Sequence, residues 1–289
     1  MRKALTLLLA AAFCGRLLAA GQSIAPPPVP DSLDFAGERV PLQNRDTRES
    51  LQRELTITIF MHSRTLATLL NAERHFTIIK PIMFENGVPM DFIYLCMAES
   101  ALNPEAVSGA GAAGLWQLMP AVGRQYGLIV NKDIDERFHV EKATEAACKY
   151  LRHAYDRFGS WTMSAASYNL GMTGVATRIA KQHADSYYDM YFPEETLRYM
   201  FRVLSFKLLT EDPEKYGFDV PFEVRYKPFE GYNYVEVSDK EIDWPKVAMA
   251  HGTSYKMLRE LNPWIRSYDY KNAKGDVFMV KIPAQDHRN

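Results

Sequence analysis

The stretch VPMDFIYLCMAESALNPEAVSGAGAAGLWQLMP, residues 88–120, joins an apolar helix, a glutamate and a turn rich in glycine and alanine. Phe92, Leu95 and Glu99 recur at helical spacing, so the pattern predicts that Glu99 lies on the face that packs into the core. An isolated glutamate near a helix end is ordinarily a solvated surface residue. The helical phase argues here for a buried one.

Two physical effects at this position favour the protonated form of the Glu99 carboxyl. Burial in apolar surroundings raises the pKa of a carboxyl, and the negative end of the helix dipole raises it further. The small residues that follow cannot cover the group completely. A carboxylic acid that keeps its proton near neutral pH in an open cleft is suited to protonating a glycosidic oxygen, so we predict that Glu99 is a catalytic acid.

Two further runs offer polar groups to a cleft. The run SGAGAAG, residues 108–114, supplies backbone without bulk, which either lets a polymer strand approach closely or makes a flexible connector. Trp116 and Gln117 follow at once and favour a shaped wall. The run SAASYNLG, residues 164–171, is either a tightly packed helix or a helix end whose Tyr-Asn pair faces a cleft.

The composition excludes several classes of function. The chain has 289 residues, 47% of them hydrophobic, which is enough for one large core or two smaller ones. With a formal net charge of −1 and no basic run interleaved with aromatic residues, it is not expected to bind nucleic acid. None of the seven histidines belongs to a His-Glu-x-x-His or Cys/His cluster, and no nucleophile elbow is present. We therefore expect neither a metal nor another cofactor.

The N-terminal residues have the pattern of an exported protein. Residues 1–20 begin with the basic pair Arg2 and Lys3, continue with a short apolar run and end in small residues, as a secretory signal peptide does. A lipoprotein would carry its lipid on Cys14, but a bulky residue precedes it where a small one is expected. Residues 21–45 contain APPPVP and few periodic apolar positions, which favours an extended linker. Cys96 and Cys148 would remain after export, either as two buried thiols or as a disulfide.

The order of elements predicts a mainly α chain that ends in a small α+β module. Residues 46–216 show no strand-like alternation and are predicted to form an all-α domain. Its helices are expected at 46–73 with a break near 60–64, and at 76–84, 89–102, 120–126, 140–158, 161–170, 173–184 and 193–209. Residues 217–289 are predicted to form a second domain. Its strands are expected at 220–226, 232–237 and 277–282, and its helices at 242–251 and 254–261.

Three motifs in order resemble one enzyme family. ESALNPEAVSGAGAAGLWQLMP (99–120), ASYNLG (166–171) and PEETLRYM (193–200) are similar to the family 1 lytic transglycosylases, nearest the membrane-bound lytic transglycosylase D branch. The resemblance covers about residues 47–217. It implies a lysozyme-like all-α fold and cleavage of the MurNAc–GlcNAc bond in peptidoglycan glycan strands. With the signal peptide, we expect a periplasmic monomer that associates with the cell wall or a membrane.

The resemblance also implies roles for individual residues. Glu99 matches the family's single catalytic acid/base. Ser100 would orient the N-acetyl group of the substrate, and a Tyr-Asn pair would contact the sugar or the glutamate. The residues expected to bind substrate are Ser100, Gln117, Met119, Tyr168, Asn169, Glu195 and Tyr199. Leu170 stands where the family more often has a small residue.

The implied mechanism needs only one carboxylate. After Glu99 protonates the leaving oxygen, the C6 hydroxyl of the same muramyl sugar attacks in place of water and gives a 1,6-anhydro product. A two-carboxylate glycosidase would need a partner at a defined separation, and the sequence leaves Glu105, Asp133 and Asp135 open in that role. Two alternatives therefore remain: a hydrolytic muramidase like goose-type lysozyme, and a non-catalytic peptidoglycan-binding scaffold.

The C-terminal module resembles a LysM domain. The similarity lies in VAMAHGTSYKMLRELNP (247–263) and FMVKIP (278–283). The usual Gly-Asp-Thr after the first strand is replaced by Ser-Asp-Lys at 238–240. Two interpretations stay open, a glycan-binding module and a structural cap.

Overall fold

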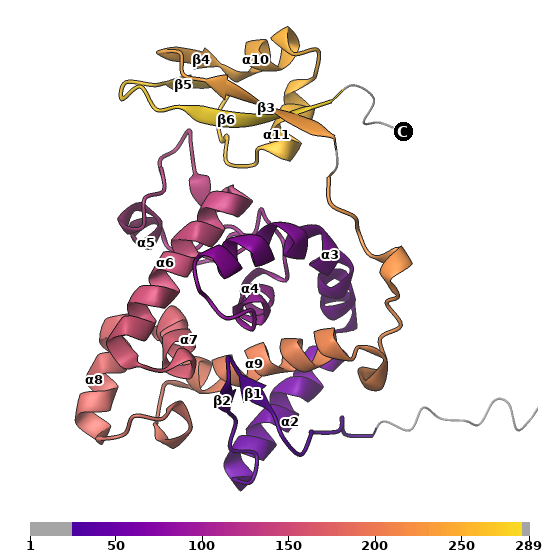
Figure 1. The fold of residues 1–289 in the computed structure, drawn as a ribbon, viewed down its shortest axis with the longest axis vertical. Helices are drawn as coiled ribbons and strands as arrows, with labels where there is room; N and C mark the ends of the chain where they lie inside the picture. The colour runs from indigo at the N-terminus through magenta and orange to yellow at the C-terminus, as the bar shows by residue number, and fades with distance from the viewer. Residues whose placement is uncertain (1–24, 230, 285–289) are drawn as a thin grey trace, which may run out of the picture.

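The computed structural model describes residues 25–229 and 231–284. A helical body carries a small module of strands and two helices at one end (Figure 1). Buried apolar side chains form two clusters, a large one within the body and a smaller one centred on the module. The expected fold class, mainly α with a small α+β module, is confirmed. The expected signal peptide, residues 1–20, lies outside the described residues.

The helices of the body follow the apolar periodicity of the sequence closely. They are α2 (Arg45–Phe60), α3 (His62–Glu85), α4 (Phe92–Ser100), α5 (Pro120–Gln125), α6 (Val140–Phe158), α7 (Trp161–Leu170), α8 (Met172–Gln182) and α9 (Glu194–Glu211). Short 3-10 turns lie at η1 (Glu136–Phe138), η2 (Tyr187–Asp189), η3 (Glu214–Tyr216) and η4 (Phe222–Val224). Local signals set several ends: Gly159 at φ +66° ends α6, and the Ser160 hydroxyl accepts the Met163 N–H at the start of α7.

One expected helix boundary is wrong. Residues 76–84 do not form a separate helix, because α3 runs unbroken through Pro81. A proline inside a helix costs about 3 kcal/mol. Ile79 and Met83, one on each side of it, are completely buried, and each buried side chain of this size contributes roughly 1.5–3 kcal/mol. Burial of the continuous apolar stripe therefore outweighs the cost of the proline.

The segment expected to be a linker is part of the body. Within residues 25–45, strands β1 (Asp34–Phe35) and β2 (Glu38–Arg39) pair antiparallel, and the Phe35 and Leu42 side chains lie in the large cluster. Glu38 accepts hydrogen bonds from the Trp161 and Thr162 amides and the Ser160 hydroxyl at the first turn of α7. The expected linker was wrong for residues 25–45. A few buried apolar side chains hold this segment against the body, and because they do not recur periodically the sequence pattern did not reveal them.

Replacing Glu38 by Gln is expected to destabilise the protein by roughly 1–3 kcal/mol, because the charged acceptor at the N-terminal end of α7 is lost. Urea unfolding followed by circular dichroism measures the change. The matched control is Glu49→Gln, which breaks an exposed pair with Arg45 and should change stability by less than about 0.5 kcal/mol. Equal effects of the two substitutions would contradict the role of Glu38.

The module contains two separate two-stranded sheets. Strand β3 (Tyr232–Val237) pairs antiparallel with β6 (Phe278–Pro283), and β4 (Glu241–Asp243) pairs antiparallel with β5 (Asp269–Lys271). Helices α10 (Trp244–Ala250) and α11 (Tyr255–Leu261) lie between β4 and β5 in the chain. The short strands β4 and β5 were not predicted, because three residues are too few to show an alternation.

The strand expected at 220–226 is absent, and this segment belongs to the body. It contains the turn η4 (Phe222–Val224), Val220 is buried in the large cluster, and the Tyr226 amide donates to the carbonyl of Leu70. The alternation of apolar residues was misleading because the side chains from Phe222 onward are exposed. Among the described residues no helix is both long and apolar enough to cross a membrane.

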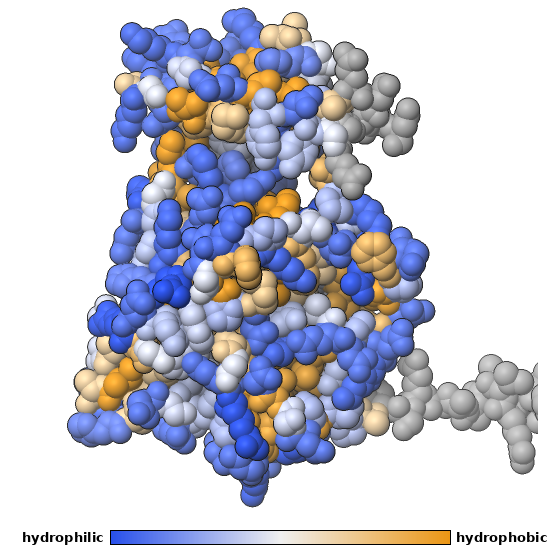
Figure 2. Space-filling model, viewed as in Figure 1, coloured by the Kyte–Doolittle hydropathy of each residue, from blue (hydrophilic) through white to orange (hydrophobic). Residues whose placement is uncertain are grey.

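Backbone contacts join the module to the body. Ile134 and Ile265 form an antiparallel bridge, and the Asp135 amide donates to the Trp264 carbonyl at 2.9 Å. The Arg266 amide donates to the Asp133 carbonyl at 2.7 Å. In the space-filling view the module and the body meet across a narrower waist (Figure 2).

Candidate active site

Glu99 lies in the last turn of α4, one residue before the helix ends. The helix ends earlier than the Asn103-Pro104 pair suggested, because Ala101 and Leu102 take left-handed conformations at φ +53° and +57°. Such conformations are unfavourable for residues with a Cβ atom, and here the complete burial of Leu102 accompanies them. The sharp turn leaves the Glu99 carboxyl at the negative end of the helix dipole.

The surroundings of Glu99 favour its protonated form. Burial raises its pKa to about 7, against the lowering effects of a hydrogen bond from Tyr199 and the charge of Arg202. The Tyr199 hydroxyl donates to Oε1 at 2.5 Å, and the negative charge of Glu195 raises the pKa. The carboxyl therefore keeps its proton to a much higher pH than an ordinary glutamate does. This raised pKa agrees with the expectation from the sequence.

Helices α7 and α9 bring two tyrosines to the glutamate. Burial and the charge of Glu99 raise the pKa of Tyr199 and of Tyr168 well above the usual value, so both keep their hydroxyl protons. The Tyr199 hydroxyl donates its hydrogen bond to Glu99, whereas the Tyr168 hydroxyl donates to the carbonyl of Trp116 at 2.8 Å. Tyr168 thus fixes the turn that follows the glycine-rich run.

Asn169 and Glu195 also have partners within the protein. The Thr196 hydroxyl donates to Asn169 Oδ1 at 2.7 Å and ties α7 to α9. The Arg202 guanidinium donates to Glu195 at 2.8 Å, and this hydrogen bond lowers the pKa of Glu195. Glu195 is therefore an ionised group at the exposed edge of the site.

The remaining predicted residues differ in exposure. The Gln117 side chain stabilises its own loop: the residue has φ +46°, and Nε2 donates to the carbonyls of Gly114 at 2.8 Å and Ala106 at 3.1 Å. The Ser100 side chain is buried and donates back to the carbonyl of Cys96 at 3.3 Å. The Met119 side chain is exposed.

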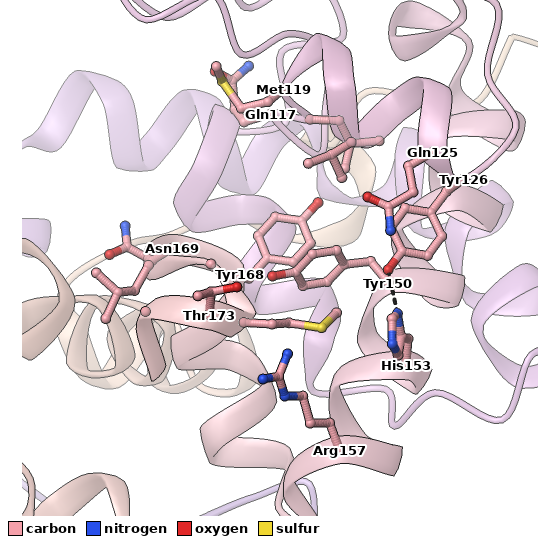
Figure 3. Close-up of a pocket in the computed structure, with 16 residues that line it drawn as sticks. Gln117, Met119, Gln125, Tyr126, Tyr150, His153, Arg157, Tyr168, Asn169 and Thr173 are labelled. Carbon is pink, nitrogen blue, oxygen red and sulfur yellow. Dashed lines mark hydrogen bonds between the residues drawn. The ribbon is translucent and has the colours of Figure 1, made fainter. Parts of the chain in front are cut away.

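A pocket of about 510 Å³ lies beside this group. Gln117, Met119, Tyr168 and Asn169 line it, whereas Glu99, Ser100, Glu195 and Tyr199 do not (Figure 3). Tyr168 connects the two sets of residues. It lines the pocket, and the charge of Glu99 raises the pKa of its hydroxyl.

Four polar or aromatic residues are among the lining residues that were not predicted from the sequence: Tyr126, Tyr150, His153 and Arg157. The Tyr126 hydroxyl and His153 Nδ1 are hydrogen-bonded at 2.9 Å (Figure 3). Three of the four recur along one side of α6 with spacings of three and four residues. That spacing of polar and aromatic residues was the available signal.

The two cysteines are buried free thiols. Cys96 and Cys148 form no disulfide, and the Cys96 thiol donates to the Leu115 carbonyl at 3.4 Å. Within residues 25–229 and 231–284, no three His, Cys, Asp or Glu side chains gather as a metal site would require.

Two family models match the chain. Residues 77–191 match the model described as the transglycosylase SLT domain, which includes Glu99, Gln117 and the Tyr168-Asn169 pair. The chain contains an SLT domain. Residues 233–286 match the model described as the soluble lytic transglycosylase C-terminal LysM-like domain. The resemblances expected from the sequence are confirmed for both parts.

The chain is also similar to curated proteins. The chain is 28% identical over 254 residues to the membrane-bound lytic murein transglycosylase D of Escherichia coli K12, which covers 85% of this chain and 54% of that protein. It is 29% identical over 123 residues to a putative tributyltin chloride resistance protein of Alteromonas sp. strain M-1, covering 42% of this chain and 59% of that one. The SLT-containing chain thus spans little more than half the length of these relatives.

Two solved structures of lytic transglycosylases match about half of this chain. The lytic transglycosylase Slt of Pseudomonas aeruginosa has a TM-score of 0.40 at 23% identity, covering 53% of this chain and 26% of that one. The 70 kDa soluble lytic transglycosylase of Escherichia coli has a TM-score of 0.42 at 23% identity, covering 48% and 24%. Likeness at this level carries no argument about the site.

The raised pKa of Glu99 has a consequence for stability. Between pH 4.5 and about 7 the folded protein keeps the Glu99 proton while the unfolded chain has lost it, so stability falls as pH rises. Glu99→Gln removes this dependence. The variant should gain up to about 3 kcal/mol relative to the wild type between pH 4.5 and 8, at about 1.4 kcal/mol per pKa unit.

Urea unfolding of both proteins across this pH range tests the expectation. The exposed Glu145, changed to Gln, is the control for the loss of a carboxyl group. A difference between Glu99→Gln and the wild type that stays constant with pH would contradict a raised pKa.

Proposed function

We propose that this protein is a lytic transglycosylase that cleaves the MurNAc–GlcNAc bond of peptidoglycan and forms 1,6-anhydro-MurNAc, with Glu99 as the single general acid/base. The observation that carries the proposal is the Glu99 carboxyl, partly buried at the end of α4 and hydrogen-bonded by Tyr199. Its pKa of about 7 suits a group that must first give a proton and then accept one. The SLT domain and the murein transglycosylase relative support the substrate.

The proposed reaction has two proton transfers through the same carboxyl. Glu99 protonates the glycosidic oxygen, and the bond to C1 of the muramyl sugar breaks while the N-acetyl group supports the developing positive charge. Ionised Glu99 then accepts the proton of the C6 hydroxyl as that oxygen bonds to C1. Tyr199 donates to the carboxylate formed between the steps, and Ser100 would orient the N-acetyl group.

The acidic residues nearby have other roles, which supports a mechanism with one carboxylate. Asp135 is buried and accepts two hydrogen bonds from the Arg137 guanidinium. Glu195 is held by Arg202, and the exposed Glu105 lies 3.8 Å from Arg266. A carboxylate that activates water must itself be free to accept a proton, and the ion pairs at these residues disfavour it.

We assign substrate binding to the pocket beside Glu99. Gln117, Met119, Tyr168 and Asn169 would contact the glycan there. Glu195 and Tyr199 lie outside the lining of this pocket and would close the far wall of the cleft around Glu99. We also propose export through residues 1–20 to the periplasm, and a monomer bound to the cell wall. The boundary between the two domains is proposed near residue 229, because Val220 is still buried in the large cluster.

Digestion of purified sacculi tests the reaction. The wild type should release muropeptides with 1,6-anhydro ends, identified by mass, and Glu99→Gln should lower the rate roughly 10³-fold or more. Muropeptides with reducing ends would show a hydrolytic muramidase instead. If no soluble product forms, the protein is a peptidoglycan-binding scaffold and the proposal fails.

Removal of the Tyr199 hydroxyl should move the pH profile. The hydrogen bond from Tyr199 lowers the pKa of Glu99, so Tyr199→Phe should shift the alkaline limb of kcat/KM to higher pH and reduce its maximum. The control is Tyr191→Phe, since Tyr191 is 78% exposed. An alkaline limb that stays at the wild-type position in Tyr199→Phe would contradict the proposed role.

A further inference from the structure

The hydrophobic cluster of the C-terminal module is not closed by the module itself. Three of its buried members come from the body: Ala113, from the glycine-rich run, and Ile134 and Phe138, from the segment that leads into α6. They are 1%, 0% and 4% exposed and share the cluster with Trp264 and Ile265 of the module. A module attached only by a linker would have no reason to depend on side chains from the body.

The segment 133–138 is held by the module on one side. The Asp135 amide donates to the Trp264 carbonyl, and the Arg266 amide donates to the Asp133 carbonyl. The Arg266 guanidinium lies over the Phe138 ring, 4.3 Å from its centroid. Backbone and side-chain contacts therefore fix the position of Asp135 and its neighbours.

On its other side this segment holds the glycine-rich loop, residues 106–118. Asp135 binds Arg137 through Nε at 2.9 Å and Nη2 at 2.7 Å. Arg137 Nη1 donates to the carbonyls of Gly111 at 2.7 Å and Leu118 at 2.9 Å, at two points of the loop. The Asp135 and Arg137 side chains are each only 9% exposed, so this ion pair is confined to one geometry.

The loop also touches the backbone of Arg137 directly. A Cβ atom on Gly114 would lie 1.8 Å from the Arg137 carbonyl oxygen. The same loop carries Gln117, and its Trp116 carbonyl accepts the hydrogen bond of Tyr168 beside Glu99. A displacement of Arg137 would therefore reach the wall of the candidate active site.

A separate ion pair fixes the module at the start of α6. Lys281 of β6 contacts Glu141 at 2.5 Å, and the rings of His139 and Trp264 stack at 5.8 Å. Burial acts to raise the pKa of Glu141, but His139 and Lys281 outweigh this effect and lower the pKa to about 2. The module is thus docked at two places on the same segment.

We infer that the C-terminal module positions the glycine-rich loop through Arg137, so that catalysis depends on the module independently of any glycan it binds. Arg137 is a positioning residue: it does not line the pocket and acts through the loop that carries Gln117. The inference about catalysis rests on the proposed transglycosylase activity. The inference about loop order does not.

The test uses the full chain and compares matched substitutions. Ile265→Ala removes the module's side chain at the bridge to Ile134, whereas Ile242→Ala makes the same change in the same cluster on β4, which pairs within the module. Arg137→Lys keeps the charge beside Asp135 but cannot hold both loop carbonyls. Two readouts are measured: hydrogen exchange of residues 106–118, and kcat and KM on sacculi and on a soluble four-sugar glycan.

The expected result is faster exchange of residues 106–118 in Ile265→Ala and Arg137→Lys, and about tenfold lower kcat on both substrates with little change in KM. Ile242→Ala should leave both readouts near the wild type. Unchanged exchange in Ile265→Ala, or equal effects of the two isoleucine substitutions, would overturn the inference. A loss confined to sacculi and expressed in KM would show a glycan-binding module instead.

If the wild type cleaves neither substrate, the proposed function fails while the exchange data still decide whether the module orders the loop. Gly114→Ala and Gly111→Ala supply a second pair for this purpose, because both glycines have a positive φ, +78° and +86°. A Cβ atom on Gly111 has nothing within 4 Å, in contrast to Gly114. Faster loop exchange only in Gly114→Ala is expected; equal exchange in both would contradict the contact with Arg137.

Discussion

The candidate active site depends on the partial burial of the Glu99 carboxyl group. Glu99 lies in the last turn of α4, which two left-handed residues follow. Helix α9 packs against α4 and supplies Tyr199, and α7 packs against α9 and supplies Tyr168. Burial disfavours the charge, and the Tyr199 hydroxyl offsets only part of that effect. The balance leaves a proton that is held at neutral pH and can still be released, which is the property that the proposed chemistry needs.

The walls around this carboxyl are built mainly from backbone groups. Carbonyls of the glycine-rich loop accept hydrogen bonds from Gln117, Arg137 and Tyr168, so polar side chains here serve first to shape the loop. Small residues allow this, because Gly114 lies against the Arg137 carbonyl where no side chain would fit. The order of the site therefore depends on residues that are far from Glu99 in the sequence.

Local signals predicted much of the fold. Gly159 and Ser160 set the boundary between α6 and α7 because a left-handed stop and a hydroxyl cap act over a few residues. The same reasoning failed at Pro81 and at Phe35, where burial in the large cluster decides the conformation. It failed in the segment 220–226 because the alternating side chains from Phe222 onward are exposed. The inward orientation of Glu99 was predictable from helical phase. The roles of Arg137 and Ala113 were not, since both depend on contacts with the module.

The proposed chemistry requires that the Glu99 carboxyl keeps its proton at neutral pH. Difference infrared spectra of the wild type against Glu99→Gln, recorded across a pH titration, follow the carbonyl stretch of the protonated carboxyl directly. If Glu99 keeps its proton at neutral pH, this band disappears with a midpoint near the pKa of about 7. A midpoint near 4.5, the ordinary value for a glutamate, would contradict it.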